Sequence, residues 1–357
     1  MKTAICLILC LLSAPVWGQK SRERLKLLHA DFLRREVKNK RILQKLEGNV
    51  EFEQGKTTIK CDVAEQEVGI EKTSLIGNVH IFDEEQSLLA DTVYFFQKRK
   101  IQIAVGRVKN VTKEDTTTAN KMTYYESEQQ LISEGDVRIA NRKERSVLTA
   151  GKAIYFRDRE YGEITENPVL VQKDSLGVET TRIFADTMEV DRKSKHTHIK
   201  RRVRIIQSKM TATCGTADYF KRENKIELTL NPKIMQENRV ISGDTLRLFL
   251  KNSNLEHAVV LGDAMVTSDA DTLAKGRWVN KLSGKKMTFY FKNKKLHKML
   301  IEGQATSYYH IIEKNEYKGA NEISGDKIEI FLTDDKADKV LVISSPDKSF
   351  GKYRPPK

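Results

Sequence analysis

The stretch LLADTVYFF, residues 88–96, decides the fold because close copies of it recur along the chain. The copies read TANKMTYYE, TAGKAIYFR, FADTMEVDR, TCGTADYFK, SGDTLRLFL, SGKKMTFYF and SGDKIEIFL. The small residue of each copy, here called the small slot, is filled by Ala30, Cys61, Ala90, Ala119, Ala150, Ala185, Cys214, Gly243, Gly284 and Gly325. These slots lie 31, 29, 29, 31, 35, 29, 29, 41 and 41 residues apart. Such a period indicates one supersecondary unit stacked many times.

A second motif lies between the copies and reads LEGNVEF, LIGNVHI, AVGRVKN and SEGDVRI. Its glycines, Gly48, Gly77, Gly106 and Gly135, are 29 residues apart. In the next copy, TENPVLV, Asn167 takes the glycine position. Each unit therefore contains a strand through the Gly-x-Val motif, a polar turn, a strand through the small–Asp motif and another turn.

Both motifs alternate apolar and polar positions with period two, which is typical of strands with one buried face. From the copy at Ala90 onward, the residues three and five places after the small slot carry no charge, whereas the position between them accepts Glu, Asp and Arg. Short polar turns suit antiparallel neighbours better than helical crossovers. We predict an all-β fold, an elongated antiparallel β-jelly-roll built from about nine two-stranded repeats. The inward lining is predicted to include Val50, Phe52, Val79, Ile81, Val93, Phe95, Met122, Tyr124, Val137, Ile139, Tyr155, Val169, Val171, Met188, Val190, Leu246 and Leu248.

The predicted organisation begins with a signal peptide over residues 1–18, where Lys2 precedes the apolar run AICLILCLL. Residues 19–45 are a degenerate first strand or an N-terminal cap, and the strand is favoured over a basic amphipathic helix. Residues 46–250 hold the regular repeats. Residues 251–345 hold two longer, diverged repeats with loop insertions expected around 267–282 and 307–322. Residues 346–357 form a basic C-terminal tail.

Removal of the signal peptide leaves Cys61 and Cys214, which occupy the same small slot five units apart. Stacked units would hold them far beyond the Cα separation of about 7 Å that a disulfide tolerates. We predict that both are free and buried.

The formal net charge is +14, so the exported protein is expected to meet acidic partners such as anionic lipid headgroups or polyanionic glycans rather than nucleic acid. Basic residues cluster in the turns that follow the small–Asp strands, which predicts a basic stripe along one edge. A solvated edge that keeps the hairpins soluble is the competing interpretation. The residues of the predicted basic edge are Lys98, Arg99, Lys100, Arg192, Lys193 and Lys195.

The sequence contains no G-x-S-x-G elbow, phosphate-binding glycine loop or HExxH motif, and we predict no enzyme activity and no cofactor. His196 and His198, in KHTH, are interpreted as a solvated turn without metal, because a zinc site would need further carboxylate or histidine ligands. A recurring aspartate next to the small slot is interpreted as a turn and strand-entry residue rather than a calcium ligand.

The signal peptide followed by repeats of GNV-x-[IF] and [A/G]-D-x-h-x-h, where h is hydrophobic, resembles the OstA-like family, the LptA type of lipopolysaccharide transport domain. The resemblance is clearest from Leu46 to about Leu250, and the opening LLHADFLRR that leads into LEGNVEF looks like the versions found in Bacteroidota. It implies a periplasmic jelly-roll whose groove accepts the acyl chains of lipid A. It also implies partners, namely an inner-membrane lipopolysaccharide transporter and outer-membrane translocon components, with end-to-end self-association as an option.

The function predicted from these features is lipopolysaccharide binding and transport toward the outer membrane. Two alternatives stay open. One is a structural or adhesive surface β-solenoid that binds acidic glycans. The other is a hydrolase with a site on the loop near 267–282, where Asp269 and Asp271 would be the candidate carboxylates.

Overall fold

The computed structural model describes residues 25–38, 41–68, 71–251, 254–270, 276–293, 295–313, 316–333, 336–346 and 349–356. These ranges contain strands and turns and no helix. Accordingly, they hold no helical segment with the length and hydropathy to cross a membrane. The predicted signal peptide and Asp271 lie outside the described residues. The chain separates into two compact units: an N-terminal unit up to Glu179 with residues 186–195, and a C-terminal unit of residues 180–185 and 196 onward.

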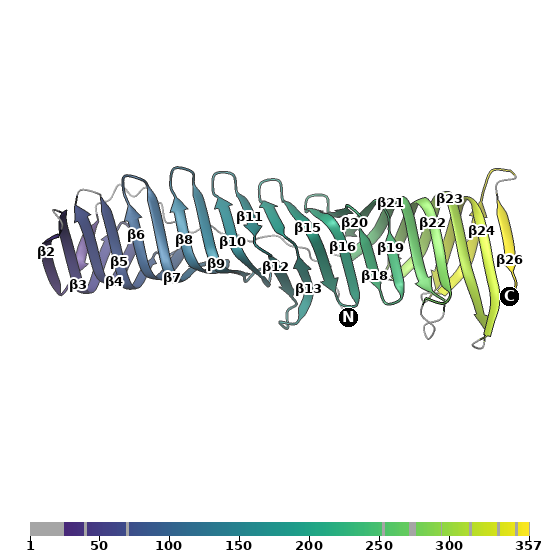
Figure 1. Ribbon diagram of the computed structural model, residues 1–357, viewed down its shortest axis with the longest axis horizontal. Coiled ribbons are helices and arrows are strands. Elements are labelled where there is room, and N and C mark those ends of the chain that lie inside the picture. Colours follow the sequence, from purple (N-terminus) through teal and green to yellow (C-terminus); the bar gives the residue numbers. More distant parts are fainter. Residues whose placement is uncertain are drawn as a thin grey trace. The chain divides into compact units, whose positions relative to one another are not determined.

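The N-terminal unit is built mainly from long strands that follow one another along the sequence (Figure 1). Its strands are β1 (Lys26–His29), β2 (Phe32–Lys38), β3 (Arg41–Gln54), β4 (Thr57–Val68), β5 (Lys72–Phe82), β6 (Gln86–Phe96), β7 (Ile101–Thr112), β8 (Asp115–Tyr125), β9 (Gln130–Asn141), β10 (Ser146–Phe156), β11 (Tyr161–Thr165), β12 (Val169–Lys173) and β14 (Thr187–Asp191).

The C-terminal unit begins with short strands and continues with longer ones. Its strands are β13 (Glu179–Phe184), β15 (His196–Gln207), β16 (Met210–Phe220), β17 (Lys225–Thr229), β18 (Lys233–Gln236), β19 (Arg239–Ser242), β20 (Thr245–Lys251), β21 (Asn254–Asp269), β22 (Val279–Lys292), β23 (Lys295–Glu313), β24 (Glu316–Thr333), β25 (Lys336–Ile343) and β26 (Phe350–Arg354).

Each Gly-x-Val motif forms a corner at which the strand bends. In β5, Gly77 and Asn78 both have positive φ, at 77° and 45°. Ile76 pairs with Thr92 of β6 and Val79 pairs with Ala90, so three steps along β5 match two steps along β6. This extra residue is a β-bulge, which bends a strand and raises its local twist. Glycine is required because a Cβ on Gly77 would collide with the carboxylate of Asp62.

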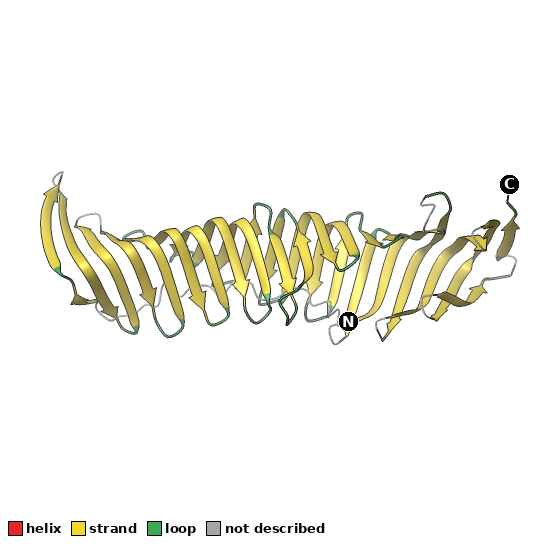
Figure 2. Cartoon of the chain, turned by 90° about the horizontal axis from the view of Figure 1, so that it is seen from below, coloured by secondary structure: helices red, strands yellow, loops and turns green. Residues whose placement is uncertain are grey.

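The corners divide every long strand into two arms. One arm ends in the turns at 97–100, 126–129, 157–160 and 192–195, which we call turn row A. The other arm ends in the turns at 83–85, 113–114, 142–145 and 174–178, which we call turn row B. Figure 2 shows the strands running between the two sides. Inward-facing side chains near the corner are buried on both arms, Leu88 and Val93 of β6 among them, so the arms cover one another there.

Hydrogen bonds connect the turns of row A to one another. The backbone N–H of Glu126 donates to the carbonyl of Lys100, that of Arg157 to Gln129, and that of Arg192 to Glu160. The accepting residue in each case has a positive φ, between 50° and 54°. Row A is therefore an ordered edge in which the repeats have the same register.

Among the strands at the Gly-x-Val position of the repeat, two are interrupted at the corner. β10 pairs with β11 through Lys152–Phe156 and with β12 through Ser146–Thr149, so β11 and β12 are the two arms of one strand. β16 pairs with β17 and β18 in the same way. The connecting residues, 166–168 and 230–232, are the sequences Glu-Asn-Pro and Leu-Asn-Pro.

The all-β antiparallel jelly-roll built from stacked repeats is confirmed in each unit. The region that sequence left between strand and cap forms the exposed strands β1 and β2. Cys61 and Cys214 are free and buried, as predicted. The loop insertion expected at 307–322 is wrong: β23 runs to Glu313 and β24 begins at Glu316, so the extra residues extend a hairpin.

Candidate functional site

The inward faces of the two arms form the interior that the sequence predicted as the lining. Most predicted lining residues are buried, with the lowest exposures, 0 %, at Val79, Val93, Met122 and Ile139. Their neighbours across the strands are small or apolar, so the interior near the corners is closed. The buried members of the predicted set are Val50, Val79, Val93, Met122, Tyr124, Val137, Ile139, Tyr155, Met188, Val190 and Leu246.

Six predicted lining residues are only half-buried; four of them keep the predicted register, namely Phe52, Ile81, Phe95 and Leu248. In β3, β5 and β6 the half-buried residue lies two positions beyond a buried valine, toward a turn row. The corresponding aromatic residues of β8 and β10, Tyr124 and Tyr155, are buried. The interior of the N-terminal unit is thus more accessible at β3–β6 than at β8–β10.

The prediction that Val169 and Val171 face inward is wrong by one residue. Both side chains are half-buried, while Leu170 is only 2 % exposed. The reason is that Glu166 and Asn167 take the two positive-φ positions of the corner, at 64° and 59°. Pro168, which is buried, therefore occupies the place of the valine in the Gly-x-Val motif.

The interior also contains polar side chains. Asn141 Nδ2 donates to Asp115 Oδ1 at 2.6 Å, with both residues nearly inaccessible. The Tyr124 hydroxyl is buried and has no hydrogen-bond partner among the described residues. Burial raises the pKa of Tyr155, against an opposing interaction with Arg192. The Asn141–Asp115 hydrogen bond fills the interior near turn row B. Near turn row A, the Tyr124 hydroxyl has a hydrogen-bond donor without an acceptor among the described residues.

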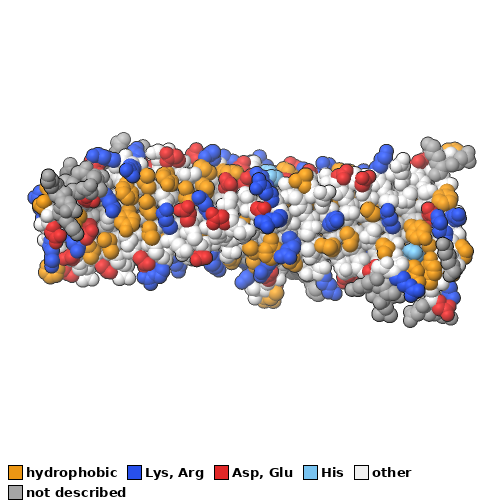
Figure 3. Space-filling view, in the orientation of Figure 1, with side chains coloured by type: hydrophobic (Ala, Val, Ile, Leu, Met, Phe, Trp, Pro, Cys, Tyr) orange, Lys and Arg blue, Asp and Glu red, His pale blue; other side chains and the backbone are white. Residues whose placement is uncertain are grey.

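The predicted basic edge lies in turn row A. Lys98, Arg99 and Lys100 are exposed in one turn; Lys193 and Lys195 are exposed in another, where Arg192 is half-buried. Lys98 forms an ion pair with Glu71 at 3.3 Å. The turn 126–129, with sequence Glu-Ser-Glu-Gln, lies between the two basic turns in the hydrogen-bonded row. The basic residues therefore form separate clusters, and the outer face carries both signs of charge among hydrophobic side chains (Figure 3).

The recurring aspartates bind the residue that follows the corner glycine on the paired strand. Asn78 Nδ2 donates to Asp62 Oδ2 at 2.9 Å, and Arg107 Nε donates to Asp91 Oδ1 at 2.9 Å. These contacts give the aspartates a structural role, because they fasten each bulge to the neighbouring strand.

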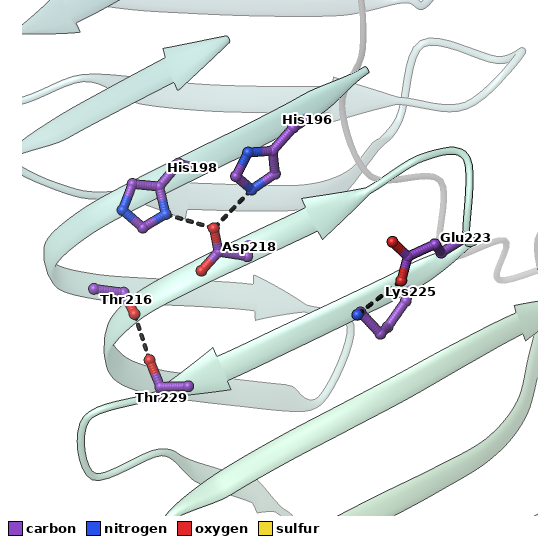
Figure 4. A network of polar contacts seen from close by, with 7 residues as sticks. All are labelled: His196, His198, Thr216, Asp218, Glu223, Lys225 and Thr229. Atoms are coloured by element: carbon purple, nitrogen blue, oxygen red, sulfur yellow. Dashed lines mark hydrogen bonds and ion pairs between the residues drawn. The ribbon is translucent and has the colours of Figure 1, made fainter. Parts of the chain in front are cut away.

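His196 and His198 do not lie in a solvated turn, which corrects the interpretation of KHTH. They are the first and third residues of β15, and Asp218 of β16 lies beside them (Figure 4). His196 Nε2 is 2.8 Å and His198 Nδ1 is 2.5 Å from Asp218 Oδ1. Sequence reasoning placed Asp218 on the outward face, from its distance to the small slot at Cys214, but did not associate it with the two histidines.

A jelly-roll assembled from two-stranded repeats, with apolar side chains lining both arms, defines the class of protein. Residues 116–254 match the family model described as LptA/(LptD N-terminal domain) LPS transport protein. The match confirms, through this stretch, the resemblance to the OstA-like, LptA-type family.

Among solved structures, one similar chain is the crystal structure of LptH, the LptA homologous periplasmic component of the conserved lipopolysaccharide transport device from Pseudomonas aeruginosa. It is 15% identical with a TM-score of 0.30, and the similarity covers 41% of this chain and 95% of that chain. No curated protein gives a significant match.

Proposed function

We propose that the protein binds lipopolysaccharide in the periplasm and transports it toward the outer membrane, with the acyl chains of lipid A held between the two arms. The observation that carries the proposal is the repeated apolar inward row within the stretch that matches the LPS transport family. The same chemical surface recurs from strand to strand, as a path for a hydrocarbon chain requires.

The energetics suit a carrier. Burial of an acyl chain contributes about 0.8 kcal/mol for each CH₂ group. Successive repeats present similar residues, such as Val50, Val79 and Val137, at equivalent positions. A chain that moves by one repeat therefore exchanges one apolar contact for a similar one, so no single repeat traps it.

Access is expected at β3–β6. The interior near the corners is closed in this state, so the arms must separate for a lipid to enter. Phe52, Ile81 and Phe95 are half-buried there, whereas the equivalent residues of β8–β10 are buried. Once the arms part, the Tyr124 hydroxyl would find an acceptor on the lipid, which relieves a cost of about 1–3 kcal/mol for an unpaired buried polar group.

The exposed clusters of turn row A are suited to the headgroup. Lys98, Arg99 and Lys100 follow Phe95 closely in the chain and place three cations at the end of its arm. An acyl chain beside Phe95 would leave its phosphates near these cations, where charge-assisted hydrogen bonds form.

The ends of the repeat series provide docking surfaces for the proposed partners, the inner-membrane transporter and outer-membrane translocon components. Phe32, Leu33 and Val37 of β2 are 63%, 73% and 75% exposed. An exposed apolar strand of this kind can pair with a strand of another chain. Self-association would use the same surfaces.

A pair of photo-crosslinking residues tests the proposal. Phe95 faces inward, while its neighbour Tyr94 faces outward with the Lys72 ammonium 4.9 Å from its ring centre. A crosslinker at Phe95 is expected to form lipopolysaccharide adducts in cells, and one at Tyr94 is expected to form few. Equal adducts at both sites, or none at Phe95, would contradict the proposal.

The alternative, a surface β-solenoid that binds acidic glycans, is favoured by the closed interior at β8–β10. It requires exposure to protease added to intact cells, whereas a periplasmic carrier is protected. The same crosslinking cells can be used for this assay.

A further inference from the structure

We propose that His196, His198 and Asp218 form a binding site for a divalent transition metal, with Zn²⁺ the best match, on the outer face of the C-terminal unit. The proposal does not depend on lipid transport. It concerns three side chains that the interior does not use.

Strand geometry brings the three residues together. Positions two apart on a strand point to the same face, so His196 and His198 lie side by side on β15. His198 is paired directly with Asp218 of β16, and His196 is paired with Phe220 two residues further on. The carboxylate therefore lies opposite one histidine and diagonal to the other, within reach of both rings.

The ligand atoms already converge. His196 Nε2 and His198 Nδ1 both lie within hydrogen-bonding distance of the same oxygen, Asp218 Oδ1. One candidate ligand atom from each residue lies within 4.8 Å of the other two. Tetrahedral zinc with bonds of about 2.0–2.1 Å holds its ligand atoms roughly 3.3 Å apart. Small side-chain rotations would reach that spacing without a change in the backbone.

The chemistry of the ligand set favours zinc. Two imidazole nitrogens and one carboxylate oxygen are the ligand types found in zinc sites that keep a fourth position open. Each neutral ring can carry its proton on the nitrogen that faces away, His196 Nδ1 and His198 Nε2, which frees the converging nitrogen for the metal. The three side chains are 31%, 27% and 18% exposed, so water or an anionic oxygen ligand can reach the fourth position.

The surroundings hold the ligands in place. The ring of His196 stacks on Phe220 with centroids 4.6 Å apart and planes 5° from parallel. The nearby Lys225 ammonium is bound to Glu223 at 2.8 Å (Figure 4). Glu227, which is paired with Asp218 across the strands, is bound to Arg247 at 2.7 Å. These ion pairs reduce the repulsion that free cations would exert on a bound metal.

A bound ion would join the first residues of β15 to the last part of β16, at the open end of the β15–β16 hairpin. Metal binding to the folded state alone would stabilise this hairpin by mass action. It would also place a positive centre with an open coordination position on the outer surface.

The test is a zinc titration of the purified, metal-free chain without a histidine tag, by calorimetry and by competition with a chromophoric chelator. We expect one site per chain, and at least about 10-fold weaker binding in each of His196→Gln, His198→Gln and Asp218→Asn. His257→Gln is the matched control, because His257 also lies on a strand and stacks on a phenylalanine, Phe249, at 4.3 Å. That variant should bind zinc as the unmodified chain does.

Cobalt provides a readout that weak surface binding does not give. Co²⁺ at the site should give the intense visible absorption of a four-coordinate ion, and the signal should disappear in the three ligand variants. Circular dichroism of each variant checks that the strands are intact. Absence of binding, equal affinity in the ligand variants, or an octahedral cobalt spectrum would overturn the proposal.

Discussion

Two kinds of corner bend the strands, and they carry their glycine on opposite sides of the strand pair. At a Gly-x-Val corner such as Gly106, the glycine has a φ of 78°, and a Cβ there would collide with the carboxylate of Asp91. At the X-Asn-Pro corner, Glu166 takes the positive φ and the glycine is Gly151 on the neighbouring strand. A Cβ on Gly151 would lie 2.6 Å from the Cβ of Glu166.

Each of these corners therefore has room for only one of two side chains: that of the positive-φ residue, or that of the residue facing it on the neighbouring strand. Leu230 repeats the arrangement of Glu166, since a Cβ on the facing Gly215 would lie 2.5 Å from the Cβ of Leu230. In both kinds of corner one of the two facing residues is glycine, and either strand supplies it; the corner at Arg201 and Arg202 is an exception that contains no glycine. Non-glycine residues then accept the left-handed conformation at a cost of roughly 1–2 kcal/mol each.

The largest expected effect comes from filling a Gly-x-Val corner. Gly106→Val combines a β-branched residue at positive φ with a clash against Asp91, and should lower the free energy of unfolding by about 4 kcal/mol. Gly177→Val is the control, because Gly177 has a φ of 80° and no atom within 4 Å of an added Cβ. It should lose only the backbone part, about 2 kcal/mol. Urea unfolding followed by circular dichroism measures both, and equal losses would refute the steric argument.

A second test concerns the register after the X-Asn-Pro corner. Leu170→Ala should cost about 3 kcal/mol, because it removes a side chain that is 2 % exposed and leaves a cavity. Val169→Ala should cost about 1 kcal/mol or less, because that side chain is half-buried. The same urea titration compares them. If Val169→Ala lowered the free energy of unfolding more than Leu170→Ala, Val169 would be the inward residue, as the sequence predicted.

The sequence predicted the repeat, the strands and the small slots, because burial of one face imposes a period of two on every copy. It misplaced Val169 because Val-x-Val after a polar pair resembles a regular copy. A corner is a backbone conformation, and the two positive-φ residues that form it carry no hydrophobic signal when they are Glu166 and Asn167. The sequence also did not reveal that the glycine lies on the corner strand at Gly106 but on the neighbouring strand at Gly151, because the pairs of residues that face each other are known only from the structure.

The cluster of His196, His198 and Asp218 could not be predicted from the sequence for a different reason. His196 and His198 are adjacent in the sequence pattern, but Asp218 is 20 residues from His198 and joins them only through strand register. Counting from the small slot at Cys214 places Asp218 on the outer face. The opposing histidine could be assigned only once the bulge at Arg201 and Arg202 was known, because it shifts the pairing between β15 and β16 by one residue.

A third test moves the glycine from one strand to the other. Gly151 has no positive φ, so Gly151→Ala should cost only what the contact with Glu166 imposes, about 2 kcal/mol. In a Glu166→Gly background the same alanine should cost almost nothing, which gives a coupling energy of about 1–2 kcal/mol. A double-mutant cycle of urea titrations measures it. Additive effects would show that the two positions do not share one space.

The last comparison of corners uses the reactivity of the two small-slot cysteines, Cys61 and Cys214, and leaves the stability of the fold unchanged. Cys61 is paired with Val50 after a corner that contains Gly48, and Cys214 is paired with Val203 after a corner formed by two arginines. Burial raises the pKa of Cys61 to about 11 and that of Cys214 to about 12. At pH 8 the native thiol of Cys61 should therefore react with iodoacetamide about 100-fold more slowly than in the denatured chain, and that of Cys214 about 1000-fold more slowly.

Peptide mapping of the alkylated protein measures the two rates separately. Because the raised pKa favours the neutral thiol, each native rate should keep rising with pH beyond about pH 9, whereas an ordinary thiol levels off there. Cys61 should react faster than Cys214 if both corners stay closed, since its pKa is the lower of the two. The reverse order would show that the corner without glycine opens more readily, because only opening can expose a thiol whose ionisation is the harder of the two.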